Sequence, residues 1–177
     1  MKRLLLMRHA KSSWAGQGVA DFDRPLSPRG AAAASAMGEY MARQHLFPDL
    51  VLCSAARRAR ETCERVVQSL GSVEVMVEAA LYSADTSEWF DRLRLLPASA
   101  VLVLVIGHNP SLQALALELA DTEASAPGLL QLQIKFPTGA LAAFRVGETV
   151  WPRLAPASCA FDFLIRPKDI SPQSVSD

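Results

Sequence analysis

The chain of 177 residues carries 18 Lys and Arg against 18 Asp and Glu, so its formal net charge is zero, and 50% of its residues are hydrophobic. This composition is typical of one ordinary globular domain. The sequence pI near 6.8 and the lack of a Lys/Arg-rich run argue against nucleic acid or an anionic membrane as a partner, so any bound anion must be held by a local cluster of cations.

The sequence contains neither an apolar segment of membrane-spanning length nor a cysteine pattern typical of disulfides or zinc. The longest apolar run, residues 100–106, falls far short of the roughly 20 residues that cross a bilayer, and the apolar run at residues 4–7 is too short for a secretory signal. Cys53, Cys63 and Cys159 have no Cys-x-x-Cys spacing, which disfavours a disulfide framework and a structural zinc site. We therefore expect a cytoplasmic protein with ordinary thiols.

The first half of the chain alternates predicted strands and helices. Residues 4–7 form an apolar run without alternation, which is typical of a strand buried on both faces of a parallel sheet. Ser27 followed by Pro28 predicts a helix that runs to about residue 44. Residues 50–53 are predicted as a second strand, and apolar residues at helical spacing predict another helix from Ser54.

The alternation continues in the second half. Residues 73–77 are strand-like, residues 87–96 have the pattern of an amphipathic helix, and residues 100–106 are the most strongly β-branched run of the chain. Asn109 is expected to cap a helix that has Pro110 at its first position and ends near residue 120.

The C-terminal part breaks this order. Residues 130–136 and 140–146 flank Pro-Thr-Gly like the strands of a hairpin, and residues 161–165 are expected to add one more strand. The whole pattern predicts an α/β fold, a three-layer α/β/α sandwich whose mostly parallel sheet has an antiparallel edge. We expect a single domain over residues 1–166, followed by a loosely ordered tail over residues 167–177.

Chemistry-bearing residues follow three of the predicted strands. Arg8 and His9 follow the first, Arg57 and Arg58 lie in the first turn of the helix after the second, and His108 follows the fourth. In an open α/β sheet, ligands bind outside the carboxyl ends of the strands, so these side chains are expected to meet at one edge. Helix N-termini at the same edge add free N–H groups and a positive dipole end, so the sequence predicts a site for a doubly charged oxyanion.

Two histidines among arginines, without metal-ligand spacing, favour phosphoryl chemistry on the side chains themselves. A neutral imidazole is a nucleophile near pH 7, because its ordinary pKa is about 6.5. We assign that role to His9, which would form a phosphoimidazole that water then hydrolyses. Arg8, Arg58 and a protonated His108 would hold the equatorial oxygens, and each such donor would lower the barrier by on the order of 3 kcal/mol.

Three segments carry a resemblance to a known family: residues 6–10 (Leu-Met-Arg-His-Ala), residues 54–62 (Ser-Ala-Ala-Arg-Arg-Ala-Arg-Glu-Thr) and residues 105–110 (Val-Ile-Gly-His-Asn-Pro). Together they resemble the histidine phosphatase superfamily, with its phosphoglycerate mutase-like fold. The short chain and the segment Asp-Arg-Pro-Leu-Ser-Pro-Arg-Gly at residues 23–30 are similar to its SixA-like phosphohistidine phosphatase branch. The resemblance covers residues 1 to about 166.

The resemblance implies that Arg8, His9, Arg58 and His108 form the phosphate pocket and that His9 is phosphorylated during turnover. It does not extend to Arg57. Arg24 matches a position close to the pocket, where it could contact substrate or pair with a neighbouring Asp, and Asn109 beside His108 is a further possible substrate contact. The chain departs from the family pattern at three positions without losing a charged phosphate ligand: Ala10 for Gly, Ala55 for Pro and Glu61 for Gln.

The general acid is the least defined part of the predicted site. Larger relatives place a Glu after the third strand, which makes Glu78 a candidate, with Asp85 and Asp21 as rivals. A protonated imidazole leaving from phosphohistidine is a better leaving group than an alkoxide, so a dedicated acid matters less for such a substrate. The lack of a clear acid therefore favours phosphoramidate substrates.

These observations lead to a hypothesis with two alternatives. The leading hypothesis is a metal-independent, cofactor-free phosphatase acting through phospho-His9 on phosphohistidine proteins of bacterial phosphorelay or phosphotransfer systems. One alternative is a phosphomonoesterase for a small phosphorylated metabolite, with Glu78 or Asp85 as the acid. The other is a binding module that recognises phosphorylated partners without turnover, which the intact His9 disfavours.

Overall fold

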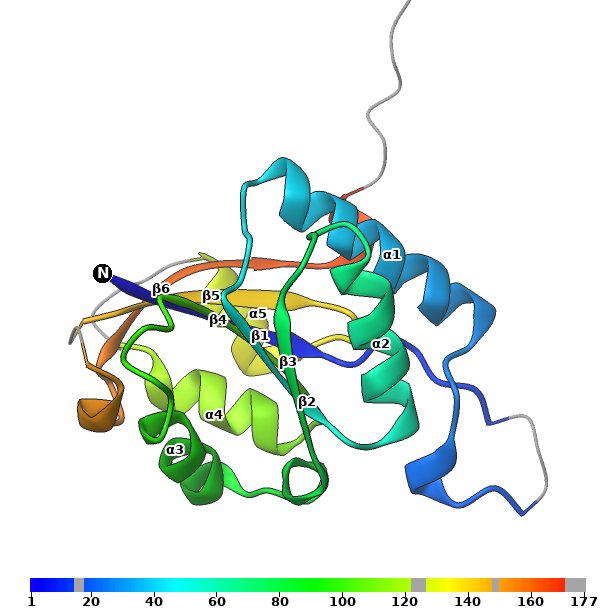
Figure 1. The fold of residues 1–177 in the computed structure, drawn as a ribbon, viewed down its shortest axis with the longest axis horizontal. Coiled ribbons are helices and arrows are strands. Elements are labelled where there is room, and N and C mark those ends of the chain that lie inside the picture. Colours follow the sequence, from blue (N-terminus) through cyan, green and yellow to red (C-terminus); the bar gives the residue numbers. More distant parts are fainter. Residues whose placement is uncertain (15–17, 122–126, 148–149, 171–177) are drawn as a thin grey trace, which may run out of the picture.

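The computed structural model describes residues 1–14, 18–121, 127–147 and 150–170, and its centre is a six-stranded sheet with the order β3-β2-β4-β1-β5-β6 (Figure 1). The first four neighbours, β3 to β1, pair in parallel, and β5 and β6 extend the sheet antiparallel. The strands are β1 (Lys2–Arg8), β2 (Leu50–Ser54), β3 (Glu74–Glu78), β4 (Leu102–Gly107), β5 (Leu141–Val146) and β6 (Cys159–Ile165).

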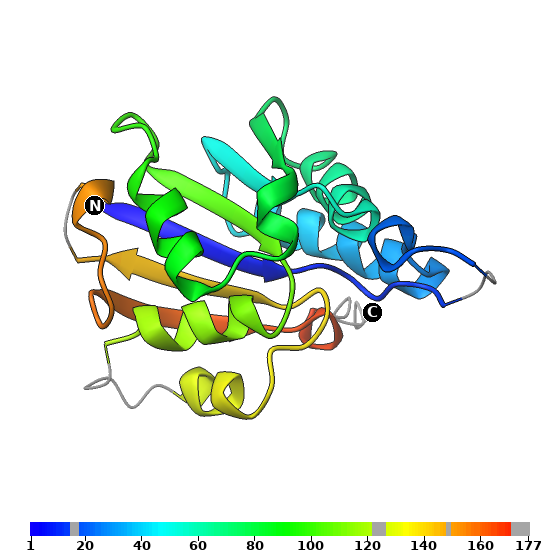
Figure 2. The same cartoon turned by 90° about the horizontal axis from the view of Figure 1, so that it is seen from below.

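Helices cover both faces of the sheet, which gives three layers (Figure 2). The helices are α1 (Pro28–Arg43), α2 (Arg57–Val67), α3 (Thr86–Arg94), α4 (Ser111–Leu119) and α5 (Pro127–Ile134). α1 and α2 pack against each other on one face, and α3, α4 and α5 lie on the other. The expected mostly parallel α/β/α sandwich with an antiparallel edge is confirmed.

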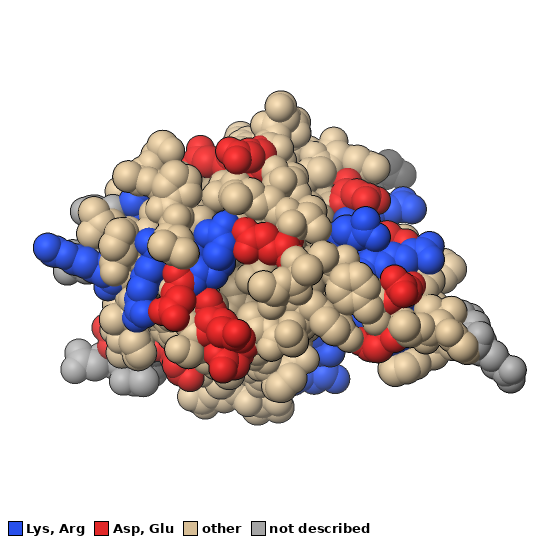
Figure 3. Space-filling view, turned by 60° about the horizontal axis from the view of Figure 1, so that its bottom comes forward, with Lys and Arg blue, Asp and Glu red and all other residues tan. Residues whose placement is uncertain are grey.

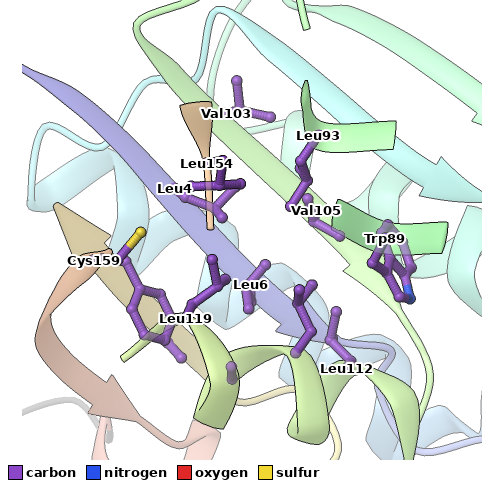
Figure 4. Close-up of a cluster of buried hydrophobic side chains, with 14 of the residues drawn as sticks. Leu4, Leu6, Trp89, Leu93, Val103, Val105, Leu112, Leu119, Leu154 and Cys159 are labelled. Atoms are coloured by element: carbon purple, nitrogen blue, oxygen red, sulfur yellow. The ribbon is translucent and has the colours of Figure 1, made fainter. Parts of the chain in front are cut away.

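Side chains of the central strands alternate between two buried clusters, one on each face of the sheet. On one face they pack against α3 and α4 (Figure 4), and the residues that meet there include Leu4, Leu6, Val103, Val105, Trp89, Leu93, Leu112 and Leu119. On the other face they pack against α1 and α2, with Leu5, Met7, Leu104, Ile106, Met37, Met41, Cys63 and Val66. Burial on both faces explains why β1 and β4 are continuous apolar runs.

The start of α1 follows the sequence prediction. Ser27 is the N-cap, and its hydroxyl accepts a hydrogen bond from the Gly30 backbone N–H at 3.0 Å. Gly30 packs directly on the backbone of Lys11, where a Cβ would lie 1.9 Å from the carbonyl oxygen. No side chain fits at this position, so the glycine lets the loop that follows β1 lie against α1.

Two local predictions are wrong. Residues 130–136 do not form a hairpin strand, because residues 127–134 are the helix α5, whose Leu129 and Leu132 are buried while Leu130 and Ile134 are exposed. The alternating Leu-Gln-Leu-Gln-Ile pattern imitates a strand, but the buried positions are three apart, as in a helix. The two sides of the antiparallel edge are instead β5 and β6.

The predicted cap of α4 is the second error. Pro110 rather than Asn109 precedes the first helical residue of α4, and the Asn109 side-chain amide donates to Gln113 Oε1 at 3.1 Å and to the Phe136 carbonyl at 3.3 Å. At the C-terminus, Pro167–Asp169 forms a short 3₁₀ helix, and the rest of the expected tail, residues 171–177, lies outside the described residues. None of the described helices combines the length and apolar character of a membrane span.

Candidate active site

His9 lies where β1 ends, at the carboxyl edge of the parallel strands. In Figure 1, β1 runs from the N-terminus into the loop that precedes α1, and His9 is the first residue after it. Its backbone N–H donates to the Gly107 carbonyl of β4 at 3.0 Å, and the next residue, Ala10, donates its N–H to Thr62 Oγ1 of α2 at 3.0 Å. The loop is therefore fixed to both the sheet and α2.

The hydrogen bonds of the His9 ring define which nitrogen carries the proton. Nδ1 lies 2.7 Å from the Ala10 carbonyl oxygen, which can only accept, so Nδ1 carries the hydrogen. Nε2 lies 3.3 Å from Arg58 Nε and accepts its N–H. Both contacts require the same neutral tautomer, and this tautomer places the ring lone pair on Nε2.

His9 is buried, and burial lowers its pKa to about 3, with smaller contributions from His108, Arg58 and Arg8. Desolvation disfavours the imidazolium form, the hydrogen bond to the Ala10 carbonyl opposes this only in part, and the positive charges of Arg58 and Arg8 add repulsion. The ring is therefore neutral at pH 7, which is the state that a nucleophile requires.

Arg58 lies in the first turn of α2, and its buried guanidinium joins His9 to Asp21. Nη1 donates to the Asp21 backbone carbonyl at 2.6 Å, and Nη2 donates to the Asp21 carboxylate at 3.0 Å. Thr62 Oγ1 donates to the Arg58 carbonyl at 2.6 Å. The Asp21 carboxylate also accepts from Tyr82 and Arg24, and these bonds together hold its pKa well below the ordinary range.

His108 and Arg8 complete the set that the sequence predicts. The rings of His108 and His9 lie 5.0 Å apart between centroids, and His108 Nε2 is 2.8 Å from Ser54 Oγ. Arg8 Nη1 donates to the Phe136 carbonyl at 2.9 Å, and burial together with Arg58 lowers the Arg8 pKa from its high ordinary value. The four residues thus come together from β1, α2 and the turn after β4.

His108 differs from the expectation in its charge. We expect a protonated ring from the sequence, but burial and then Arg58 lower the pKa of His108 to about 4. The ring is therefore neutral at pH 7 in the free protein, and it donates one hydrogen bond rather than two. A bound phosphate dianion would raise this pKa, because an opposite charge close by favours the charged form.

The described residues contain three buried side-chain nitrogen or oxygen atoms without a hydrogen-bond partner: Arg8 Nε, His108 Nδ1 and Asn109 Oδ1. All three belong to residues at this edge of the sheet, two of them in the predicted phosphate pocket. Orphaned buried polar atoms are rare in folded proteins and cost free energy. Two of the three atoms belong to side chains that can donate to an oxyanion, which fits a site for a phosphate group.

Charge at this edge is local rather than spread over the molecule. Basic and acidic side chains are intermingled on the face shown in Figure 3, in keeping with the zero net charge. At the site, by contrast, Arg8 and Arg58 are in the same cluster, and Asp21 is the carboxylate that contacts Arg58. The surplus of positive charge suits a dianion.

Arg24 and Arg57 each form an ion pair with a nearby carboxylate. Arg24 pairs with the Asp21 carboxylate at 2.7 Å, which is one of the two roles left open for it by the sequence. Its guanidinium also stacks 3.3 Å from the ring centre of Trp14, which is 79% exposed. Arg57 is half exposed and pairs with Glu61 at 2.7 Å, one turn along α2.

The carboxylates proposed as general acids are engaged elsewhere. Glu78 accepts from Arg92 Nη2 at 2.6 Å and from Arg92 Nε at 2.9 Å. Asp85 is the N-cap of α3 and accepts from the Glu88 backbone N–H at 2.9 Å. In the described part of the chain, neither side chain is hydrogen-bonded to a residue of the phosphate pocket.

Ser54 and Tyr82 are site residues that the sequence reading misses. Ser54 ends β2 and contacts His108, and Tyr82 in the segment after β3 donates to Asp21 at 2.6 Å and packs edge-on against the His108 ring, 5.5 Å between centroids. Ser54 is the last residue of one strand and Tyr82 follows another at the same edge, so their position was a usable signal. Their uncharged side chains gave no chemical reason to select them.

The two lowered histidine pKa values predict how stability depends on pH. Both rings bind a proton in the unfolded chain below about pH 6.5 but resist it in the folded protein down to about pH 4 for His108 and about pH 3 for His9. The contribution of the two neutral rings to the free energy of unfolding is therefore complete above about pH 6.5. It falls by about 1 kcal/mol per pH unit for each ring as the pH decreases toward 4.

Urea denaturation at pH 7, 6 and 5 measures this dependence. We expect a shallower pH slope in the His9→Gln/His108→Gln double variant and an unchanged slope in His45→Asn, because His45 is exposed. An identical slope in the wild type and the double variant would contradict the lowered pKa values.

The chain is similar to known proteins in both sequence and structure. A family model described as the histidine phosphatase superfamily (branch 1) matches residues 4–94. An uncharacterised protein of Mycobacterium tuberculosis is 33% identical over 157 residues, which cover 87% of this chain and 95% of that protein.

Solved structures give a similar result. A candidate phosphohistidine phosphatase SixA from Nakamurella multipartitia is 34% identical, with a TM-score of 0.80 over 94% of this chain and 96% of that chain. A second candidate phosphohistidine phosphatase SixA, from Agrobacterium tumefaciens, is 29% identical, with a TM-score of 0.73 over 81% of this chain and 90% of that chain.

Proposed function

The chain belongs to the histidine phosphatase superfamily, and from this premise we propose that it is a metal-independent phosphatase that hydrolyses protein phosphohistidine through phospho-His9. The observation that carries the proposal is the tautomer of the buried His9 ring. Its Nδ1 hydrogen is held by the Ala10 carbonyl, so Nε2 presents a lone pair beside Arg58. A module that only bound phosphate would have no need of a neutral nucleophile in this orientation.

The reaction has two displacements at phosphorus. In the first, the His9 Nε2 lone pair forms a bond to phosphorus while the bond from phosphorus to the substrate imidazole breaks, and that ring, which already carries a proton on its other nitrogen, leaves as neutral imidazole. In the second, water attacks phosphorus and the bond to Nε2 breaks, which releases inorganic phosphate and restores the neutral ring. Arg8, Arg58 and His108 orient the phosphoryl oxygens and offset the charge that develops on them.

The positions of the acidic side chains support a phosphoramidate substrate. Glu78 is paired with Arg92, and Asp85 caps α3. Asp21 contacts Arg58, but its depressed pKa keeps it ionised and so unable to donate a proton. An alkoxide leaving group needs a proton donor in the transition state, whereas an imidazole that is already protonated does not. The two solved candidate SixA phosphatases are in line with this choice of substrate.

The direct test compares three substrates with equal enzyme: a phosphohistidine-containing phosphotransfer domain, free phosphoramidate and para-nitrophenyl phosphate. We expect the highest kcat/KM on the phosphohistidine protein and an unchanged rate in the presence of a chelator. A preference for small phosphomonoesters would support the metabolite phosphatase instead. Phosphate binding without turnover of any substrate would support the binding module, and activity restored only by a divalent metal would contradict a metal-independent reaction.

A second prediction concerns Glu78 and Asp85. The Glu78→Gln/Asp85→Asn double variant should keep kcat on phosphoramidate within about threefold of the wild type, because neither carboxylate contacts the pocket residues and each neutral replacement is isosteric. Thermal melting measures the small loss of stability expected from the weakened Arg92 pair, at most about 1 kcal/mol, because Asn caps a helix as well as Asp does. A fall of about a hundredfold or more in kcat with an unchanged fold would identify one of them as the acid.

A further inference from the structure

A cavity of about 530 Å³ lies beside the candidate active site, outside the phosphate pocket. It is lined by the start of α1, the end of α5 and the segment that follows β6. None of the four pocket residues lines it. Its volume falls within the range of about 300–1,000 Å³ that is usual for small-molecule sites.

The cavity is strongly basic in a protein that has no net charge. Among the described residues that line it there are five cations and no Asp or Glu: the cations are Lys11, Arg29, Lys135, Arg166 and Lys168. In the described part of the chain, Lys11, Arg29 and Lys135 form no ion pair, whereas Arg166 is paired with Asp169 at 2.7 Å. Clustered like charges raise the free energy of the unliganded state, and a bound polyanion relieves that repulsion.

The cavity also offers apolar surface next to these cations. Ile134, the last residue of α5, is 85% exposed, and Leu164 and Pro137 continue the apolar wall. An ion alone would gain nothing from this wall, whereas a ligand with a hydrophobic ring and several negative charges would use both parts of the lining.

One wall of the cavity is shared with the active site. Pro137 and Thr138 line the cavity, and the residues on either side of them hold the nucleophile segment. On one side, the Phe136 carbonyl accepts from Arg8. On the other, the Gly139 N–H is shared between the carbonyls of Arg8 and His9, at 3.0 and 3.1 Å. A ligand in the cavity would therefore contact the turn that positions His9.

We propose that this cavity is a second binding site, separate from the phosphate pocket, for a small organic polyphosphate whose ring packs on Ile134 and whose phosphates contact Lys11, Arg29 and Lys135. The proposal goes beyond the phosphatase function and does not depend on it. Binding there needs no turnover, and the cations concerned are exposed side chains outside the catalytic set.

The test uses β,γ-methylene-ATP, which resists hydrolysis, and isothermal titration calorimetry with the full chain. We expect the Lys11→Gln/Lys135→Gln double variant to bind the nucleotide at least about tenfold more weakly than the wild type, since two charge-assisted contacts are lost. Arg65→Gln removes an exposed cation of α2 outside the cavity and should leave the affinity unchanged, which controls for the general loss of charge.

Two further variants separate the cavity from the phosphate pocket and test the apolar contact. Arg58→Ala should retain nucleotide binding, whereas binding that is lost in Arg58→Ala and kept in the double variant would place the nucleotide in the phosphate pocket and overturn the proposal. Ile134→Ser should lower the affinity for the nucleotide several-fold and leave the affinity for inorganic triphosphate unchanged. Equal losses for both probes, or no binding to the wild type, would also contradict it.

Discussion

Substituting His9 by Ala should reduce turnover of any phosphorylated substrate by on the order of 10⁴-fold or more, because the variant loses the atom to which phosphorus bonds. The methyl group replaces a ring whose Nε2 is held beside Arg58 at 3.3 Å. The remaining cations would still bind phosphate, so the affinity for vanadate should fall much less than kcat. A loss confined to kcat separates the nucleophile from the residues that only hold the oxyanion.

Quenching the wild type during turnover should trap a phosphate that is stable to base and labile to acid, since protonation of the ring makes imidazole a leaving group. Phosphorus NMR should place the phosphate on Nε2, because Nδ1 is occupied by its hydrogen bond to the Ala10 carbonyl at 2.7 Å. His45→Asn, at an exposed histidine, should trap as much phosphate as the wild type. Full turnover by the His9→Ala variant would eliminate His9 as the nucleophile.

The parts of the fold that the sequence predicts correctly are those where one physical requirement dominates. β1 and β4 are buried on both faces and so must be continuous apolar runs, and α1 begins at a Ser-Pro pair that suits an N-cap and the first helical position. The order of these elements implies parallel strands. The carboxyl edge of the sheet, and with it the meeting of His9, Arg58 and His108, follows from that order.

The wrong predictions occur where local pattern and tertiary packing disagree. The segment at residues 130–136 alternates like a strand, but helix α5 buries Leu129 and Leu132 against the rest of the protein and leaves Ile134 to solvent. Asn109 has the chemistry of a helix cap, but its amide bridges Gln113 and the Phe136 carbonyl instead. The burial of Leu129 and Leu132 and the contact from Asn109 to Phe136, 27 residues away, involve segments that no short sequence window contains together.

The protonation states of the site residues and their hydrogen-bond partners could not be predicted from the sequence either. A histidine beside arginines could be read as an imidazolium, and only the burial of His108 shows that its pKa falls to about 4. Asp21 appears in the sequence as one of several possible acids. The structure makes it the partner of Arg58, Arg24 and Tyr82, three residues that are distant from one another along the chain.

Arg58→Ala should lower kcat/KM by about a hundredfold, equivalent to roughly 3 kcal/mol of transition-state stabilisation, because it removes a preorganised donor beside the nucleophile. Its neighbour provides a matched control. Arg57 has the same charge and lies in the same helical turn, but its side chain is half exposed and paired with Glu61. An exposed pair of this kind contributes at most about 1 kcal/mol to stability, so Arg57→Ala should keep kcat/KM within about twofold of the wild type.

Arg58→Lys completes the series by keeping the charge while removing the planar fork. One ammonium group cannot contact His9 Nε2, the Asp21 carbonyl and the Asp21 carboxylate in the arrangement that Nε, Nη1 and Nη2 now make. We therefore expect a rate between those of the wild type and Arg58→Ala, with Asp21 still held by Arg24 and Tyr82. Equal rates for Arg58→Ala and Arg57→Ala would show that the general positive charge of α2, rather than the position of the Arg58 guanidinium, is what the reaction uses.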